Sequence, residues 1–423
     1  MSPHTVRRTT AVVVRRMAVE PVVVLQGPRS VGKSTTLHEI AREHAVSIVD
    51  LDRPELREAV AADPAAFVAG SAPVCIDEFQ KVPIVLDAIK AELNSDLRPG
   101  RFLITGSTRF DALPQAAQAL TGRVHIVRLL PFSQGEIDGV EEDFVRVAID
   151  DPSLLLSAAR SGAIGGSATR DEYVERVCRG GMPLAIGRSG VDRDRWFDDY
   201  IGVSLERDVA ELARIRQKAK LPPLLERLAG QTAQSLNMSS VARSVGLDPT
   251  TAGNYTTLLE DLFLIRRLPA WGRSLRSRAT SAPKLHVLDS GVAAHLLRLT
   301  PDRLARLDPA ALTEFGHLLE TFVVGEIIKQ VTWLDDTVDV GHWRTRDGDE
   351  VDFVLERRDG GVIGIEVKAG SRVTQRDGGG LRKLRDLCGD SFVGGIVLTT
   401  GDLAYNLDST IAVLPIDRLW KPQ

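Results

Sequence analysis

The sequence has little cysteine, no long apolar run and no internal repeat. Its three cysteines, Cys75, Cys178 and Cys388, are isolated and lack C-x-x-C spacing, which argues against a disulfide framework and a zinc site. No stretch approaches the roughly 18 consecutive apolar residues that a membrane-spanning helix needs. The basic N-terminal segment has an apolar run only at residues 11–14, too short for a signal-peptide core. We therefore expect a soluble cytoplasmic protein without membrane contact.

What is present is an ordinary globular composition, with 43% hydrophobic and 26% charged residues among 423. This length predicts two to four domains. The net charge of -4 hides an asymmetry, because residues 211–282 hold 11 Lys and Arg against 5 Asp and Glu, whereas residues 283–423 hold 17 against 22. A polyanion is therefore expected to dock on the basic segment 211–282.

The first 130 residues alternate continuous apolar runs with amphipathic patterns, as repeated strand–helix units do. Such runs are typical of strands that are buried on both faces of a parallel sheet. The expected strands are residues 22–26, 47–51, 73–78, 101–107 and 124–129. We predict that residues 1–139 form a doubly wound α/β domain whose ligands bind at the carboxyl ends of its strands.

The rest of the chain divides into three further segments. Residues 140–218 have a helical pattern and are predicted to form a lid or linker. Residues 219–282 contain three helical patterns, and a GLDP turn between the second and third predicts a helix-turn-helix. Residues 283–423 begin with PKLHVLDSG, continue with a long helix around LLETFVVGEIIKQ and then return to strands, which predicts a C-terminal α/β domain.

A phosphate-binding loop follows the first expected strand. GPRSVGKS matches G-x-x-x-x-G-K-[ST] at every fixed position, and a helical pattern follows it. In this arrangement backbone N–H groups surround phosphate oxygens at a helix N-terminus, the lysine contacts the β- and γ-phosphates, and the serine hydroxyl ligates Mg²⁺. The predicted nucleotide-binding residues of this loop are Gly27, Pro28, Arg29, Ser30, Val31, Gly32, Lys33, Ser34 and Thr35, with Ser34 also a metal ligand.

Acidic and polar residues follow two later strands of the same domain. In PVCIDEFQ, Asp77 is expected to hold the Mg²⁺ shell and Glu78 to polarise the attacking water. In RFLITGST, Ser107 or Thr105 is expected to sense the γ-phosphate, although β-propensity explains the threonine equally well. The sequence therefore predicts Lys33 and Glu78 as catalytic residues of an ATP hydrolase.

Arg123, just before the fifth expected strand, is a further catalytic candidate. An outward-pointing arginine there can complete the site of a neighbouring copy by neutralising transition-state charge. The alternative is a surface ion pair. The first role requires a homo-oligomer, so the oligomeric state stays open.

These motifs resemble, in order, those of bacterial and archaeal AAA-type P-loop ATPases that are fused to a C-terminal domain of unknown function with a restriction-endonuclease-like core. The resemblance rests on GPRSVGKS, CIDEFQ, LITGS, LTGR and LLPFSQGE, and continues through GGMPLAI, LERDV, APKLHVLDSG, HLLETFVVGEI and DEVDFVLE. GGMPLAI also resembles the Gly-x-Pro lid motif of signal-transduction ATPases, which implies that Pro183 lies near the adenine. Family members often have threonine where this chain has Ser34, which keeps the hydroxyl.

The basic segment is predicted to form a winged-helix-like module over residues 219–282. Its third helical pattern offers Thr250, Thr251, Asn254 and Thr257 as base readers but no arginine before its end, so we expect nonspecific DNA binding through phosphates. The arginines available for this are Arg243, Arg266, Arg267, Arg273, Arg276 and Arg278. A module used for packing or for protein contacts is the alternative.

Acidic residues and a lysine in the C-terminal segment form a second candidate site. DGG between EVDFVLE and VIGIEVK predicts a hairpin, and strand alternation puts Glu366 and Lys368 on one face, within reach of Asp352. With Glu320 on the preceding helix, these residues resemble the PD-(D/E)xK nuclease pattern, although Asp352 lacks the preceding proline. A solvated face with cross-strand ion pairs is the alternative.

Together these observations predict an ATP- and Mg²⁺-dependent AAA-type ATPase that acts on or with DNA. The alternative is a nucleotide-driven switch whose nuclease-like domain is catalytically inactive and binds a partner.

Overall fold

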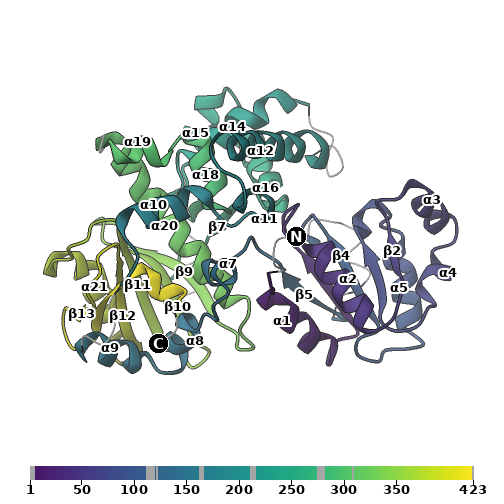
Figure 1. Ribbon diagram of the computed structural model, residues 1–423, viewed down its shortest axis with the longest axis horizontal. Coiled ribbons are helices and arrows are strands. Elements are labelled where there is room, and N and C mark those ends of the chain that lie inside the picture. Colours follow the sequence, from purple (N-terminus) through teal and green to yellow (C-terminus); the bar gives the residue numbers. More distant parts are fainter. Residues whose placement is uncertain are drawn as a thin grey trace. The chain divides into compact units, whose positions relative to one another are not determined.

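The computed structural model describes residues 5–110, 120, 122–161, 166–209, 216–273, 282–306 and 309–421. They fall into two compact units (Figure 1). The first unit comprises Met1–Phe132 together with Met182–Leu184 and Asp261–Phe263, and the second comprises Ser133–Gly181, Ala185–Glu260 and Leu264–Gln423.

The first unit contains a parallel five-stranded sheet in the order β2-β3-β4-β1-β5. Its strands are β1 (Val22–Gln26), β2 (Ile48–Asp50), β3 (Val74–Asp77), β4 (Phe102–Gly106) and β5 (Val124–Arg128). Every residue of β1, β3 and β4 is buried, so both faces of the sheet centre are covered. The predicted α/β class and the predicted strands of this part are confirmed.

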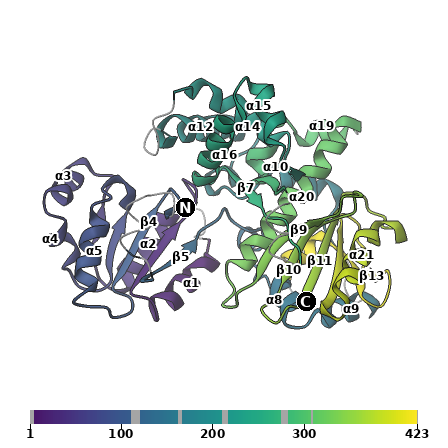
Figure 2. The same cartoon turned by 180° about the vertical axis from the view of Figure 1, so that it is seen from behind.

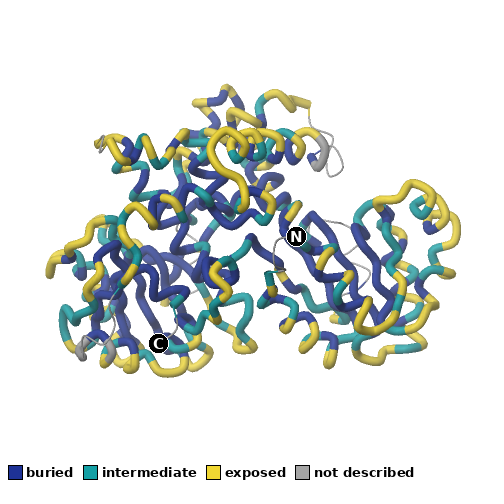
Figure 3. The backbone as a smooth tube through the Cα atoms, in the orientation of Figure 1, coloured by how far each residue is buried: buried dark blue, intermediate teal, exposed yellow. Residues whose placement is uncertain are grey.

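Helices cover this sheet and bury its aliphatic side chains (Figure 2). They are α1 (Arg8–Met17), α2 (Lys33–Glu43), α3 (Pro54–Ala62), α4 (Pro64–Val68) and α5 (Val85–Leu93). One face of β1, β3 and β4 shares a core with Val85, Leu86 and Ile89 of α5. Figure 3 shows the strands as buried and the outer surface of the helices as exposed.

Residues 133–161 and 166–209 are largely helical, and the lid or linker role predicted for residues 140–218 stays a prediction. The helices here are α7 (Gln134–Asp138), α8 (Phe144–Asp150), α9 (Pro152–Ser161), α10 (Arg170–Arg179), α11 (Pro183–Ile186) and α12 (Gly190–Val203). Except for Met182–Leu184, this segment is part of the second unit, in which α10 packs against α18 (Ser290–Leu296).

Two motifs that lie about 100 residues apart in the sequence, GGMPLAI and HVLDSG, meet where α10 packs against α18. The buried Asp289 carboxylate caps α18 by accepting from the N–H groups of Gly291 (2.9 Å) and Val292 (3.1 Å), and it also accepts from Gly181 N–H at 2.8 Å. A Cβ on Gly180 would lie 2.3 Å from this carboxylate, and the φ of Gly180 is 68°. Packing and backbone conformation therefore require glycine at position 180, and the three hydrogen bonds require a carboxylate at position 289.

A module of three helices and a small sheet follows. It consists of α14 (Leu221–Ala229), α15 (Met238–Val245), α16 (Pro249–Asp261), β6 (Gln234–Ser235), β7 (Ile265–Leu268) and β8 (Lys284–Val287). Gly246, with φ 68°, ends α15 in the left-handed conformation and begins the predicted tight turn to α16. The central strand of the sheet is β8, which pairs with β6 and β7. The boundary predicted before residue 283 thus falls inside a sheet, because β8 hydrogen-bonds to strands on both sides.

The C-terminal part is a mixed six-stranded sheet in the order β13-β14-β12-β11-β10-β9. Its strands are β9 (Asp339–Arg344), β10 (Glu350–Glu356), β11 (Val362–Lys368), β12 (Phe392–Thr399), β13 (Tyr405–Asn406) and β14 (Ile411–Pro415). The helices α20 (Pro309–Val331) and α21 (Gly379–Cys388) pack against this sheet, whereas α19 (Pro301–Ala305) contacts α10 and α20. The predicted hairpin is confirmed, since β10 and β11 are antiparallel neighbours. None of the helices in the described ranges combines the length and the hydropathy that a membrane span needs.

Candidate functional site

The predicted phosphate-binding loop lies between β1 and α2 of the first unit. Its backbone has the left-handed conformation at Ser30 (φ 63°) and at Gly32 (φ 99°), the N-cap of α2. A Cβ on Gly27 would lie 2.0 Å from the Leu129 carbonyl oxygen, so only glycine fits there. The loop therefore directs the N-terminal N–H groups of α2 towards the space it encloses, as phosphate binding requires.

The Lys33 amine lies inside this loop. It donates to the carbonyl oxygens of Pro28 (2.8 Å) and Gly27 (3.1 Å), and the residue is only 4% exposed. Both of these hydrogen-bond acceptors are neutral, and the Lys33 charge also acts on the Asp77 carboxylate. An ammonium in this position can form charge-assisted hydrogen bonds with the anionic phosphates of a nucleotide.

Asp77, at the end of β3, is the predicted holder of the Mg²⁺ shell. The hydroxyls of Thr105 and Ser34 donate to its buried carboxylate. Burial raises the pKa of Asp77, while these two hydrogen bonds and the positive charge of Lys33 oppose the rise. The Ser34 hydroxyl and the Asp77 carboxylate thus converge as the hard oxygen donors that Mg²⁺ prefers, and the residues present fit this ion.

Glu78 has a left-handed backbone, with φ 55° and ψ 47°. Its N–H donates to Thr105 Oγ1 at 3.2 Å, and its buried carboxylate accepts from Ser107 Oγ at 3.0 Å and from Gln80 Nε2. A strained backbone that is held by hydrogen bonds on both sides is typical of functional residues. Ser107 therefore contacts Glu78, as expected for residues that directly follow the neighbouring strands β4 and β3.

Sequence reasoning missed Gln80 and Arg7, which support this site, and named Thr105 only as a candidate for sensing the γ-phosphate. Gln80 orients the Glu78 carboxylate, and Thr105 is hydrogen-bonded to both Asp77 and Glu78. Arg7 donates to the carbonyl oxygens of Val31 (2.7 Å) and Leu130 (2.6 Å) and thereby braces the loop. Gln80 lies in the CIDEFQ motif itself, whereas nothing in the local sequence indicates the role of Arg7.

The structure separates Arg123 from the phosphate-binding loop. β5 is parallel to β1 with Val124 opposite Val22, so Arg123 lies at the amino end of the sheet while the loop follows its carboxyl end. Five strand residues separate these ends by about 15 Å. Arg123 instead donates to Asn94 Oδ1 at 2.9 Å. A role in the site of a second copy stays a prediction, and so does an adenine contact by Pro183, which belongs to the same unit.

The four C-terminal candidates come together in the second unit, but around an unforeseen lysine. The Lys284 amine, delivered by β8, lies 2.8 Å from Glu320 Oε1 of α20 and 2.8 Å from Asp352 Oδ1 of β10. Glu350 Oε1 is 3.8 Å away. Lys284 is 1% exposed. We call Lys284, Glu320, Asp352, Glu366 and Lys368 the carboxylate cluster.

Glu366 and Lys368 form the other side of this cluster. Lys368 Nζ donates to Glu366 Oε1 at 2.7 Å, as a shared strand face requires. Phe353 pairs with Ile365, so Asp352 lies opposite Glu366 one residue further on, and Asp352 Oδ2 accepts from Val367 N–H at 2.9 Å. Glu366 Oε2 is buried without a hydrogen-bond partner. Burial, followed by the charge of Asp352, raises the pKa of Glu366 to about 8.

This arrangement does not fit the predicted nuclease-type Mg²⁺ site, because an ammonium group stands between two of the proposed ligands. Within the described ranges, no group of three or more His, Cys, Asp or Glu side chains is arranged to hold a metal. Lys284 was missed because it is separated by 36 and 68 residues from its two partners, and its motif, PKLHVLDSG, shows only a lysine at the start of an apolar strand.

The arginines proposed for DNA binding differ in their surroundings. Arg267 pairs with Glu260 at 2.5 Å, and Arg273 donates to the Leu387 carbonyl oxygen at 2.8 Å. Arg243 is exposed on α15. Arg276 and Arg278 lie outside the described residues.

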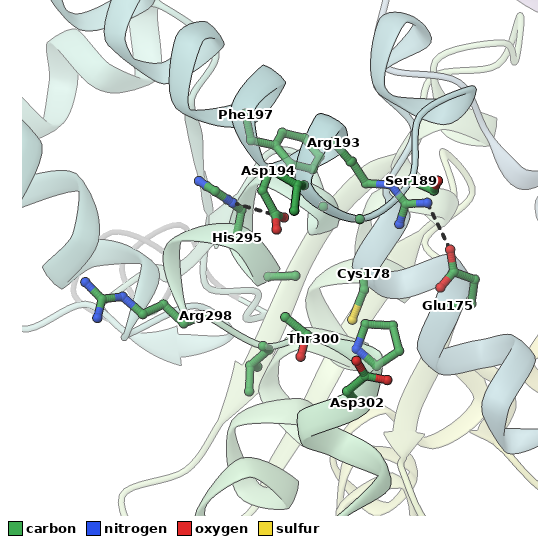
Figure 4. Close-up of a pocket in the computed structure, with 16 residues that line it drawn as sticks. Glu175, Cys178, Ser189, Arg193, Asp194, Phe197, His295, Arg298, Thr300 and Asp302 are labelled. Atoms are coloured by element: carbon green, nitrogen blue, oxygen red, sulfur yellow. Dashed lines mark hydrogen bonds and ion pairs between the residues drawn. The ribbon is translucent and has the colours of Figure 1, made fainter.

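The second unit also contains a cavity of about 590 Å³ formed by α10, α12, α18 and the residues after α18 (Figure 4). Several of its charged side chains form ion pairs. Arg193 lies 3.1 Å from Glu175, and His295 lies 3.7 Å from Asp194 and 2.7 Å from Asp198. None of the predicted site residues lines this cavity.

Three family models match the chain. Residues 19–138 match an AAA domain, residues 170–303 match a domain of unknown function (DUF8612), and residues 315–419 match another (DUF4143). The first match supports the N-terminal prediction, since this part is similar to the AAA domains of P-loop ATPases. The second match extends across residue 283, in agreement with the position of β8.

The chain is also similar over nearly its whole length to uncharacterized proteins of Mycobacterium bovis and Mycobacterium tuberculosis. Each is 27% identical over 98% of this chain and 84% of the relative. Solved structures with detectable similarity include a Walker-type ATPase of Pyrococcus abyssi, with 14% identity, 69% of this chain and 95% of that chain covered, and a TM-score of 0.40. Another is the Thermotoga maritima RuvB Holliday junction branch migration motor, with 17% identity, 62% and 88% covered, and a TM-score of 0.29.

Proposed function

We propose that the first unit hydrolyses ATP with the help of Mg²⁺. The observation that carries this proposal is the convergence of Lys33, Ser34 and Asp77 in one buried network, next to Glu78. These groups supply, in one place, the positive charge, the metal ligands and the base that phosphoryl transfer to water requires.

Each residue then has a distinct task. The Lys33 ammonium exchanges its two carbonyl partners for β- and γ-phosphate oxygens. Ser34 and Asp77 would hold the metal, which would supply positive charge against the charge that develops on the phosphates. Glu78 orients the attacking water and accepts its proton, and Ser107 and Gln80 keep its carboxylate in place.

Removal of the Ser34 hydroxyl tests the metal assignment. We expect Ser34→Ala to lower Mg²⁺-dependent phosphate release from ATP by roughly 10- to 1000-fold, because one metal ligand and one donor to Asp77 are lost. Ser95→Ala is the matched control, since it removes a hydroxyl from an exposed position of the same unit that has no predicted role in the site. Equal activity in the two variants would show that Ser34 does not hold the metal.

We further propose that the module formed by α14–α16 and β6–β8 resembles a winged helix and binds duplex DNA through phosphates. Thr250, Asn254 and Thr257 are exposed on α16 at the spacing of one helix face. The net charge of +6 over residues 211–282 favours a polyanion. In this proposal ATP binding and hydrolysis control the DNA engagement.

The DNA proposal predicts a steep salt dependence. Measured by fluorescence anisotropy with a random duplex, the affinity of the full chain should fall roughly 10- to 100-fold between 50 and 200 mM salt, as release of a few counterions requires. Arg243→Ala on α15 should reduce both the affinity and the slope, whereas Arg195→Ala, an exposed arginine on α12, should change neither. Salt-independent binding, or none, would remove the DNA proposal.

A further inference from the structure

We propose that Lys284 is the resident cation of the carboxylate cluster, so that this cluster binds no divalent metal ion and the C-terminal sheet does not cut nucleic acid by metal catalysis. This inference does not depend on ATP hydrolysis by the first unit. It concerns the very residues whose spacing suggests a nuclease.

The first argument is that most of the carboxylate oxygens that a metal ion would need already accept hydrogen bonds within the protein. Lys284 Nζ donates hydrogen bonds to Glu320 Oε1 and Asp352 Oδ1, both at 2.8 Å, which is the length of a charge-assisted hydrogen bond. The second Asp352 oxygen accepts from Val367 N–H, and Lys368 takes Glu366 Oε1. A divalent ion that used Glu320 and Asp352 would have to displace the Lys284 amine.

The second argument is that Lys284 is poorly able to leave. Its strand, β8, is hydrogen-bonded on both sides, with Lys284 opposite Leu268 of β7 and Ser235 of β6. The residue is almost fully buried. Burial disfavours its charged form, but Asp352, Glu320 and Glu350 outweigh burial and raise the pKa of Lys284, so the amine stays protonated at neutral pH.

The third argument concerns what remains when the amine is removed. Glu320 Oε1 and Asp352 Oδ1 would lose their common partner, and the buried Glu366 Oε2 already has none. Glu320 and Asp352, which share one cationic partner, carry the kind of oxygen ligand that Mn²⁺ or Mg²⁺ prefers once that partner is gone. The cluster is therefore a cation site that this chain fills with its own lysine.

The test uses the full chain without nucleotide and Mn²⁺ as the probe, with bound ion measured by electron paramagnetic resonance and unfolding followed by Tm. Wild type and Asp352→Asn are expected to bind the same amount of Mn²⁺. Lys284→Met, similar in length but uncharged, should lower Tm by about 10 °C because buried carboxylates lose their partner. Mn²⁺ should restore much of this loss, and the double variant Lys284→Met/Asp352→Asn should show no restoration.

Two outcomes would overturn the proposal. One is a Mn²⁺ site in wild type that Asp352→Asn removes; this comparison needs no Lys284 variant and decides the matter even if Lys284→Met does not fold. The other is a folded Lys284→Met protein that gains no Mn²⁺ site.

Plasmid cleavage provides a second readout. Supercoiled plasmid incubated with wild type, ATP and Mg²⁺ or Mn²⁺ should show no nicking beyond that of Asp352→Asn. Nicking that Asp352→Asn abolishes would contradict the proposal. Lys33→Ala is included in parallel to keep the ATPase proposal separate from the proposal on the carboxylate cluster. Loss of ATP hydrolysis in this variant should leave the Mn²⁺ result unchanged.

Discussion

Lys33→Ala is expected to weaken ATP binding by about 100-fold or more. The amine lies inside the phosphate-binding loop, where it donates to the carbonyl oxygens of Gly27 and Pro28. Two charge-assisted contacts to phosphate are each worth about 1.5–3 kcal/mol, and roughly 1.4 kcal/mol corresponds to a tenfold change in affinity. Isothermal titration with ATP and Mg²⁺ measures this loss directly.

Lys90→Ala is the matched control for this experiment, because Lys90 is an exposed lysine on α5 of the same unit. It should bind ATP as wild type does. If Lys33→Ala also retained wild-type affinity, residues 27–34 would not be the nucleotide site.

Glu78→Gln is expected to lower ATP turnover by roughly 10²- to 10⁴-fold, the usual contribution of a positioned general base. Binding should be retained, because glutamine has the size of glutamate and Lys33, Ser34 and Asp77 are unchanged. The variant should therefore hold intact ATP, which rapid filtration followed by chromatography of the bound nucleotide detects.

Glu55→Gln, an exposed change on α3, serves as the control for this variant and should turn over at the wild-type rate. Thr105→Val is not a suitable control, since Thr105 contacts both Asp77 and Glu78. Bound ADP in place of ATP in Glu78→Gln would show that another group activates the water.

The sequence predicts the first unit well because its information is local. Strands buried on both faces read as continuous apolar runs, and the expected strand at residues 22–26 coincides with β1. The loop residues and the Asp77–Glu78 pair are each contained in one short motif next to a strand. Parallel pairing then brings the strand ends together without further information.

The carboxylate cluster could be predicted only in part. Strand alternation and the DGG turn are local features, and they place Asp352, Glu366 and Lys368 together as the structure does. The contact of Lys284 with Glu320 and Asp352 depends on the docking of β8, which no local pattern encodes. The same docking of β8 explains why the domain boundary predicted next to residue 283 falls inside a sheet, since the sequence does not show that β8 pairs with strands on both sides.

The contact of Lys284 with Glu320 and Asp352 changes the functional interpretation of the C-terminal sheet. Four residues at nuclease-like spacing suggest metal-dependent cleavage, but a fifth residue from a separate segment supplies the cation. A spacing pattern shows which side chains can converge. It does not show what already lies between them.

The central claim is Mg²⁺-dependent ATP hydrolysis at Lys33, Asp77 and Glu78, and single-turnover release of labelled phosphate tests it most directly. The full chain in excess over ATP should release phosphate with Mg²⁺, and should release almost none with a chelator or when Glu78 is glutamine. Release at the wild-type rate by Glu78→Gln, or no Mg²⁺-dependent release by wild type with or without duplex DNA, would contradict the claim.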